Sequence, residues 1–189
     1  MTDENILWRA QTYALLASLL VQPPSKELLA NLAAIDVTEP ESPMGKHWSL
    51  LVAAAAQADV DVIDDEFQRL FVGVTHGELM PYGSYYQTGF LMEEPLAVLR
   101  TDLARLGLER HEEKKEPEDH AAAECDVMRL ILMAEGTPVV TAEDFFQQHV
   151  QPWMEQFFAD LAKAKQAEFY RVIGSFAQSF ISLETKLLS

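Results

Sequence analysis

The chain contains a single cysteine, Cys125, among its 189 residues. One cysteine cannot form an intramolecular disulfide, so nothing in the sequence indicates an oxidising compartment. Cys125 has apolar neighbours at helical spacing, and we expect a buried, unreactive thiol. The start of the chain lacks the basic region of a signal peptide, because Asp3 and Glu4 stand there. No apolar run reaches the length of a membrane span, so we expect a cytoplasmic protein without stable membrane insertion.

Basic residues are scarce as well. The chain has 14 Lys and Arg against 30 Asp and Glu, a formal net charge of −16. Nucleic acids and anionic membranes are polyanions, so this charge argues against both as partners. A basic ligand would be attracted, although an acidic surface can also serve only to keep a protein in solution.

Sequence patterns of catalysis and metal binding are also missing. None of the five histidines follows a glutamate by three residues, as helical di-iron sites require. A zincin motif beginning at His111 would need its second histidine where Lys115 stands. No nucleophile elbow, phosphate loop or dinucleotide fingerprint occurs. We therefore expect no metal, no cofactor and no enzymatic activity, with a small hydrolase using Asp119 and His120 as the weakest alternative.

Helical periodicity dominates the chain instead. Apolar residues recur at steps of three and four in at least seven segments, and no segment alternates like a strand. Asp61 is expected to cap the segment that contains Ile63, Phe67 and Leu70. The pattern predicts an all-α, single-domain helical bundle over residues 1–189. The expected helical segments are 3–21, 25–32, 43–58, 61–70, 95–106, 117–135, 141–157 with a kink or a new start at Pro152, and 169–187.

Two stretches lack this periodicity. Residues 72–89 contain four glycines and three tyrosines, and we expect a loop there. Loops of this length are more often functional than ordinary connections, although the tyrosines could equally pack the loop onto the core. Residues 109–116 are too charged for a core, and this solvated connection could act as a hinge.

The stretch Glu116-Pro117-Glu118-Asp119-His120 lies between the charged connection and the next apolar pattern. Proline is favoured in the first turn of a helix, and acids are favoured at the positive end of the helix dipole. The carboxylate of Asp119 could orient the imidazole of His120 and raise its pKa. By spacing alone, this stretch is also an ordinary helix start.

This EPEDH stretch, together with four other short runs, closely resembles the TorD/DmsD family of redox-enzyme maturation chaperones. The order and spacing match over roughly residues 60–180. The resemblance implies an all-helical, cytoplasmic chaperone that binds the twin-arginine leader or the apoprotein of a molybdenum enzyme before export. Pro81 followed by Tyr82 differs from members that carry a proline pair and a tryptophan, which bears on the choice of client. The other runs are Leu70-Phe71-Val72-Gly73, Pro81-Tyr82-Gly83-Ser84-Tyr85-Tyr86, Pro152-Trp153 and Phe169-Tyr170-Arg171.

The resemblance also implies a peptide-binding site. A leader arginine needs a carboxylate acceptor beside an apolar groove, and Asp119 could be that acceptor. His120 could position this carboxylate or a peptide carbonyl. Apolar contacts could come from Leu70, Phe71, Tyr82 and Tyr86. The predicted peptide-binding residues are Leu70, Phe71, Gly73, Pro81, Tyr82, Gly83, Ser84, Tyr86, Glu116, Pro117, Asp119 and His120.

Two questions stay open at the level of sequence. The leading alternative function is a helical maturation factor that binds a client enzyme independently of any leader peptide. The oligomeric state is either a monomer or a helix-swapped dimer, because some members of the resembled family exchange helices between protomers. The apolar stripe of 169–187 favours a core position over pairing with another subunit.

Overall fold

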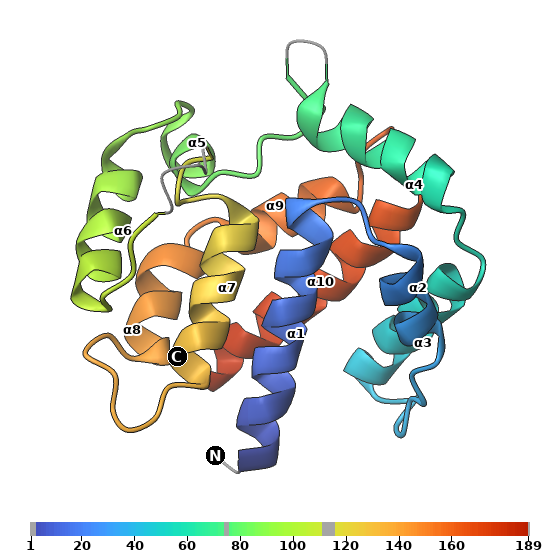
Figure 1. The fold of residues 1–189 in the computed structure, drawn as a ribbon, viewed down its shortest axis with the longest axis horizontal. Helices are drawn as coiled ribbons and strands as arrows, with labels where there is room; N and C mark the ends of the chain where they lie inside the picture. Colours follow the sequence, from blue (N-terminus) through green and yellow to red (C-terminus); the bar gives the residue numbers. More distant parts are fainter. Residues whose placement is uncertain (1–2, 74–75, 111–115, 189) are drawn as a thin grey trace. The chain divides into compact units, whose positions relative to one another are not determined.

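The computed structural model describes residues 3–73, 76–110 and 116–188 (Figure 1). Within these ranges the secondary structure is helical, no strand occurs, and one isolated antiparallel bridge joins Tyr82 and His120. The all-α prediction is confirmed. None of the helices in these ranges is both long and apolar enough to cross a membrane. The helices are α1 (Asp3–Val21), α2 (Lys26–Ala33), α3 (Pro43–Ala56), α4 (Val60–Phe67), the π-helix η1 (Gln68–Val72), α5 (Gly83–Thr88), α6 (Glu94–Arg105), α7 (Ala121–Leu132), α8 (Ala142–Phe145), the π-helix η2 (Phe146–Val150), α9 (Met154–Leu161) and α10 (Phe169–Leu187).

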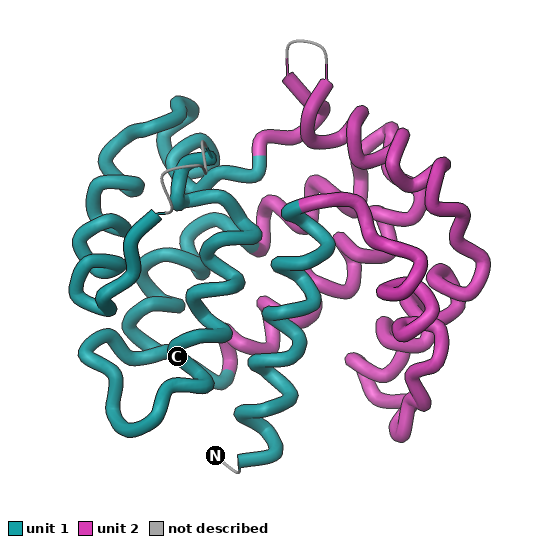
Figure 2. Tube along the Cα trace, in the orientation of Figure 1, with its two compact units in different colours: residues 1–21, 81–154, 187–189 teal, residues 22–80, 155–186 magenta. Residues whose placement is uncertain are grey.

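The chain forms two compact units, coloured separately in Figure 2. Unit 1 comprises residues 1–21, 81–154 and 187–189, and unit 2 comprises residues 22–80 and 155–186. The single domain expected over residues 1–189 stays a prediction. Of its hinge at 109–116, residues 111–115 lie outside the described residues.

In unit 1, helix α1 packs along helix α7, and the two lie side by side in Figure 1. The paired faces carry apolar residues at helical spacing, including Tyr13 and Leu16 on α1 and Met128 on α7, all fully buried. Cys125 on α7 is also fully buried, and burial raises the pKa of its thiol well above the ordinary value. The expectation of a buried cysteine is confirmed, and the raised pKa agrees with an unreactive thiol.

In unit 2, helix α10 supplies the apolar stripe of the core. Phe176 is fully buried and meets the indole of Trp48 from α3 edge to face, with ring centroids 4.6 Å apart. Phe180 is also fully buried. The predicted stripe is therefore confirmed as core up to this point, but Leu187 at its end is 49% exposed, so the prediction extended the buried face too far.

The start of α10 is fixed by a buried glutamate from α4. Glu66 is 2% exposed, and its carboxylate accepts hydrogen bonds from the backbone N–H groups of Glu168, Phe169 and Tyr170 at 2.8, 3.1 and 2.8 Å. The first N–H groups of a helix have no partner within the helix. A carboxylate satisfies them and also interacts favourably with the positive end of the helix dipole.

The cap of α4 differs from the sequence prediction. Asp59, not Asp61, precedes the helix, and its Oδ1 accepts from the N–H groups of Asp61 and Val62 at 3.0 and 3.4 Å. Asp59 has an extended backbone with φ −106° and ψ 121°, the conformation that an N-cap requires. Asp61 lies already inside the first turn, so the predicted start was two residues late.

The predicted loop at 72–89 is wrong for its last third, where helix α5 forms. Six residues are too few to display helical periodicity, so the sequence pattern gave no signal for α5. The helix ends at Gly89, whose φ of 84° is a left-handed conformation that glycine adopts without strain. Residues 74 and 75 of the predicted loop lie outside the described residues.

Candidate functional site

The EPEDH stretch lies in unit 1, immediately before helix α7. The sequence predicted that the helix begins at Pro117, but α7 begins at Ala121. His120 is the N-cap, with φ −69° and ψ 138°, and its Nδ1 accepts a hydrogen bond from the N–H of Ala122 at 3.1 Å. The predicted helix start was therefore four residues early.

The late start of α7 has a cause that is distant in sequence. The backbone N–H of Gly83 donates to the carbonyl of Asp119 at 2.8 Å, and the N–H of Ala121 donates to the carbonyl of Pro81 at 2.9 Å. These two bonds form the bridge between Tyr82 and His120, which holds His120, directly before Ala121, in an extended conformation. The bridge also brings the predicted residues of the 81–84 segment next to Asp119 and His120.

Asp119 is the most deeply buried acid of this stretch, with 1% exposure. Its Oδ2 accepts a hydrogen bond from the backbone N–H of Ser84, in the first turn of α5, at 2.7 Å. Its Oδ1 is buried and has no hydrogen-bond partner among the described residues. Because buried polar atoms are nearly always hydrogen-bonded, this single unsatisfied oxygen needs an explanation.

Tyr82 and Glu116 form a second contact between the two segments. The hydroxyl of Tyr82 donates to Oε2 of Glu116, and the Tyr82 ring lies edge to face against the imidazole of His120, with centroids 5.2 Å apart. Burial, and then the hydrogen bond to Glu116, raise the pKa of Tyr82, so its hydroxyl stays protonated as the donor. Tyr82 and Glu116 are thus engaged with each other rather than with Asp119.

The protonation of His120 differs from the sequence prediction. Asp119 was expected to raise its pKa, but the pKa is lowered, because burial outweighs the attraction of Glu116 and Asp119. A neutral imidazole has one protonated nitrogen. Since Nδ1 accepts from Ala122, the proton resides on Nε2.

Glu118 points to a different partner. Its two carboxylate oxygens accept from Nε and Nη2 of Arg100 on α6, at 3.1 and 2.9 Å. Burial would raise the pKa of Glu118, but the hydrogen bonds from Arg100, a backbone hydrogen bond and the charges of Arg100 and Arg110 together hold that pKa below its ordinary value. Glu118 is therefore an ion-pair partner of α6, and it leaves Asp119 as the acid of this stretch with a spare acceptor.

A second buried acid, Glu124, was not among the predicted residues. It is 2% exposed, and its Oε2 accepts a hydrogen bond from the indole N–H of Trp153 at 3.0 Å. Burial, with a further contribution from the charge of Asp119, raises the pKa of Glu124 well above its ordinary value. The sequence carried a signal for it, because Glu124 lies three residues after Ala121 and four before Met128 on an otherwise apolar helix face.

Asp119 and Glu124 line one pocket within unit 1, with a volume of about 360 Å³. Its walls come from α5, α6, η2 and the beginning of α7. Of the predicted residues, only Gly83 and Asp119 are among those that line it. The lining residues are Gly83, Gln87, Thr88, Glu94, Pro95, Val98, Asp119, Glu124, Gln148 and His149.

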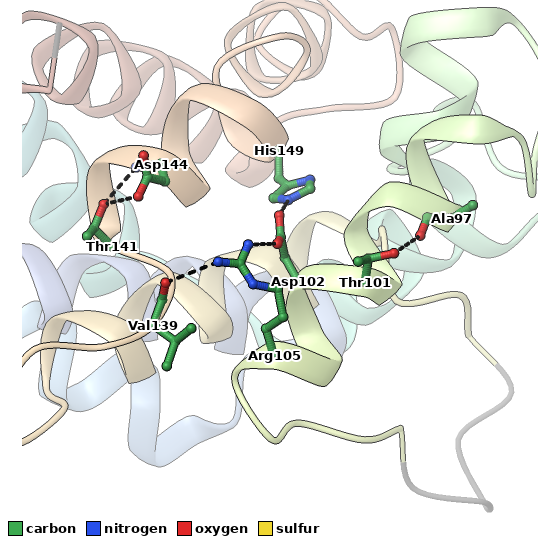
Figure 3. A network of polar contacts seen from close by, with 8 residues as sticks. All are labelled: Ala97, Thr101, Asp102, Arg105, Val139, Thr141, Asp144 and His149. Atoms are coloured by element: carbon green, nitrogen blue, oxygen red, sulfur yellow. Dashed lines mark hydrogen bonds and ion pairs between the residues drawn. The ribbon is translucent and has the colours of Figure 1, made fainter.

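His149 in this wall is held by a polar network (Figure 3). Its Nε2 lies 3.0 Å from Oδ2 of Asp102, and Nη1 of Arg105 lies 2.7 Å from the other oxygen, Oδ1. A carboxylate only accepts, so Nε2 carries the proton. Burial lowers the pKa of His149 more than Asp102 raises it, and the ring is therefore neutral at pH 7. Arg105 also donates to the carbonyl of Val139 at 3.4 Å, which ties α6 to the segment before α8.

Three predicted residues belong to unit 2. Leu70 is fully buried in η1. The ring of Phe71 packs against those of Phe67 and Tyr170, with centroids 5.0 and 5.3 Å away. Gly73 ends η1 with a φ of 62°. Within unit 2 these residues have packing roles, and their part in a peptide groove stays a prediction.

The remaining predicted residues lie in unit 1. Tyr86 on α5 packs its ring against the indole of Trp153, with centroids 5.6 Å apart. The carbonyl of Pro117 accepts from the N–H of His120 at 3.3 Å in the turn before α7. In the ranges 3–73, 76–110 and 116–188, no three His, Cys, Asp or Glu side chains group closely enough to hold a metal ion.

Comparison with known proteins places this site in a family. The model of the nitrate reductase delta subunit family matches residues 38–159, which include every residue that lines the pocket. The chain belongs to the nitrate reductase delta subunit family. This match covers well over half of the chain.

Curated relatives agree with that assignment. The chaperone protein TorD of Vibrio atlanticus (strain LGP32) is 24% identical, over 96% of this chain and 94% of that protein. A protein of Haemophilus influenzae assigned as the Tat proofreading chaperone DmsD is 26% identical, over 59% of this chain and 54% of that protein. The predicted membership of the TorD/DmsD family is confirmed, and so is the expectation of a chaperone rather than an enzyme.

A solved structure agrees with the fold. A protein of Archaeoglobus fulgidus proposed to act in redox enzyme maturation superposes with a TM-score of 0.57 at 18% identity, over 94% of this chain and 93% of that one. At this identity the likeness supports the helical architecture alone. Family membership, by contrast, supports a chaperone role in the maturation of redox enzymes.

Proposed function

We propose that this chaperone is cytoplasmic and binds the twin-arginine leader or the apoprotein of a molybdenum-containing oxidoreductase, during cofactor insertion and before export. The observation that carries the proposal is the buried Oδ1 of Asp119, which has no partner among the described residues. An unsatisfied buried acceptor costs a fold about 1–3 kcal/mol. A cost of this size is explained if a ligand donates to the oxygen in the working complex.

An arginine fits this acceptor for three reasons. The guanidinium has five N–H donors in a planar fork that matches a carboxylate. It is also less strongly hydrated than a lysine ammonium, so it enters a buried site at a lower cost. The formal net charge of −16 would attract a basic peptide over the range of solvent screening.

Titration calorimetry with a twin-arginine peptide, on wild type and Asp119→Asn, tests this role. Asparagine keeps the shape, and its carbonyl oxygen can still accept from the N–H of Ser84, but the charge is lost. Affinity should fall by roughly ten- to a hundredfold, because charge-assisted hydrogen bonds contribute about 1.5–3 kcal/mol. If Asp119 only stabilises the helix start, Asp119→Asn should lower the free energy of unfolding by about 0.3–1 kcal/mol, seen as a lower melting temperature. Its affinity for the peptide should then equal that of wild type.

Two further variants complete the comparison. Glu118→Gln changes the neighbouring acid, which is paired with Arg100 and does not line the pocket, and it should leave affinity unchanged. His120→Gln removes the cap of α7, so it should lower the melting temperature more clearly than it lowers the affinity for the peptide. Equal affinity of wild type and Asp119→Asn would remove the main support for leader binding at this site.

The alternative, recognition of a client without its leader, is favoured by an exposed apolar segment between α5 and α6. Phe90 and Met92 are 69% and 71% exposed, with Leu91 between them. Met92 also has a φ of 62°, which is rare for a residue with a side chain. Capture of a client whose leader has been deleted would favour this alternative, and loss of that capture in Phe90→Ser would assign it to the segment.

The compartment follows from the same proposal, and the oligomeric state needs a test of its own. A leader is intact only before export, so the chaperone must act in the cytoplasm, and cell fractionation tests this location. The exchange of a helix between protomers would give a dimer, whereas the unswapped chain would be a monomer. Light scattering coupled to size exclusion distinguishes a mass of 21.3 kDa from twice that value.

A further inference from the structure

The pocket beside Asp119 is large enough for a side chain. Ligand pockets in proteins usually span about 300–1,000 Å³, and this one, at about 360 Å³, lies at the lower end. A side chain or a small organic cation would fit.

The charge of the lining selects a cation. Three of the residues that line the pocket are acids, namely Glu94, Asp119 and Glu124, and no lysine or arginine is among the described residues that line it. His149 adds no positive charge at neutral pH, because burial lowers its pKa and its proton is directed to Asp102. A cation entering the pocket would therefore meet hydrogen-bond acceptors and no competing positive charge from these lining residues.

The oxygens of the two buried acids differ in their hydrogen-bond partners. Asp119 has Oδ1 without a partner, whereas Glu124 uses Oε2 to accept from Trp153. The other oxygen of Glu124, Oε1, faces Gly83, where a Cβ would lie only 3.2 Å from it. The absence of a side chain on Gly83 leaves space beside this oxygen.

We propose that this pocket binds one arginine side chain of the leader peptide, with Asp119 and Glu124 together accepting hydrogen bonds from its guanidinium. The inference rests on the proposed function and deepens it by naming a second carboxylate and a subsite for one side chain. Two acceptors suit a guanidinium better than an ammonium, because its donors are fixed in one plane.

Binding changes the protonation of Glu124. In the empty pocket, burial and the nearby Asp119 raise the pKa of this carboxyl well above its ordinary value, which favours the protonated form. A guanidinium in contact favours the carboxylate, so the Glu124 proton passes to solvent as the cation enters. About one proton is then released for each arginine bound, and affinity rises with pH until Glu124 is ionised without the ligand.

Other titratable groups near Glu124 do not supply this proton. The thiol of Cys125 and the neutral imidazole of His120 have their pKa values shifted by burial toward the uncharged form. Asp102 is held ionised by His149 and Arg105 despite its burial. The charged and titratable groups that face the pocket or adjoin Glu124 are Glu94 and Asp102 from α6, Asp119 and His120 before α7, Cys125 and Asp126 on α7, and His149 from η2.

Titration calorimetry with the twin-arginine peptide in phosphate and in Tris at one pH measures the released proton. Wild type should release up to about one proton, and Glu124→Gln should release none and bind about tenfold more weakly. Asp126→Asn is the matched control, because Asp126 lies on the same helix, pairs with Arg129 at 2.7 Å and does not line the pocket. This variant should keep both the affinity and the proton release of wild type.

A second probe separates failure of the subsite from failure of the proposed function. N-acetyl-arginine amide is added to the full chain, and the indole N–H resonance of Trp153, assigned by its loss in Trp153→Phe, is followed by NMR. The resonance should shift in wild type and not in Gly83→Ala, whose Cβ would lie 3.0 Å from the indole nitrogen. A shift without leader binding would overturn the proposed function alone. Leader binding with no shift, no proton release and no effect of Glu124→Gln would overturn the subsite alone.

Discussion

Two buried acids, one in each compact unit, differ in how their carboxylate oxygens are hydrogen-bonded. Glu66 in unit 2 and Asp119 in unit 1 are 2% and 1% exposed, and each accepts from a backbone N–H in the first turn of a helix. Glu66 uses both oxygens on three N–H groups. Asp119 uses one oxygen on Ser84 and keeps the other buried without a partner among the described residues.

The two acids are equally buried and differ in how many of their acceptors are in use. A carboxylate with all its acceptors in use contributes its hydrogen-bond energy to the fold. A carboxylate with an unused, buried acceptor carries a desolvation cost that the fold does not recover. The following predictions test this comparison. Changes at a carboxylate whose acceptors are all in use should alter stability, and changes at a carboxylate with an unused buried acceptor should alter affinity.

The largest effect is expected for Glu66→Ala, which leaves three backbone N–H groups of α10 without their acceptor. We expect a loss of roughly 2–5 kcal/mol in the free energy of unfolding, measured by urea denaturation. Glu66→Gln, which keeps one acceptor oxygen, should lose less. The matched control is Glu78→Ala, an exposed acid that accepts from Lys165 and Gln166, which should cost about 1 kcal/mol. Equal stability of Glu66→Ala and wild type would contradict the architectural role.

A second pair of variants compares glycines. A Cβ on Gly174 in unit 2 would lie 2.5 Å from the backbone N of Ala162 and 2.9 Å from the carbonyl oxygen of Phe158. Backbone atoms cannot move aside cheaply, so Gly174→Ala should cost about 1–3 kcal/mol. Gly83→Ala meets only side-chain atoms of Trp153 and Glu124. Gly83→Ala should therefore lower the melting temperature less than Gly174→Ala does, but it should weaken peptide binding. A larger loss of stability in Gly83→Ala than in Gly174→Ala would contradict the comparison.

The third prediction concerns the pH dependence of stability through Glu124. Its pKa is raised above the unfolded value of 4.5, so the folded chain keeps a proton that the unfolded chain releases. The stability from this group is therefore complete below about pH 4.5 and is lost as pH rises toward the folded pKa. The side chain in Glu124→Gln cannot ionise, so the melting temperature of this variant should rise relative to that of wild type between pH 5 and pH 8. A gain on the order of 1 kcal/mol corresponds to about 2–4 °C, and a parallel pH profile of the two proteins would count against a neutral Glu124.

The smallest effect is expected for Arg100→Ala. Arg100 is half-exposed and pairs with Glu118 at 2.9 Å, and surface ion pairs contribute about 0.2–1 kcal/mol. The loss of stability should shrink further in high salt, and peptide affinity should stay within twofold of wild type. A large loss of affinity would mean that the Arg100–Glu118 pair holds the binding site in shape.

Much of the fold was predictable because its signals are local. Pro95 in the first turn of α6 and Gly107 after its end, with a φ of 70°, lie where their backbone preferences favour them. The break at Pro152 is confirmed, with α9 beginning at Met154. Thr141 caps α8 as expected, accepting from the N–H of Asp144 at 3.1 Å. Each of these features depends on the properties of a few neighbouring residues.

The candidate site was only partly predictable. Asp119, Gly83 and Ser84 were named from a family resemblance, and the structure brings them together. Glu124 was missed, because its position three residues from Ala121 could indicate either a solvated edge or a buried acid. The predicted rise in the pKa of His120 was wrong, since the nearby carboxylates were visible in the sequence but the degree of burial was not.

The sequence by itself determined the helical class, the family and the buried thiol, because periodicity, proline and glycine positions and short motifs are properties of neighbouring residues. The tertiary structure decided where α7 begins, because the hydrogen bonds that hold Asp119 and Ala121 come from Gly83 and Pro81. It also decided which acids have all their acceptors in use and which have a raised pKa. Hydrogen-bond completion and desolvation sum over groups from distant parts of the chain, and no local pattern encodes that sum.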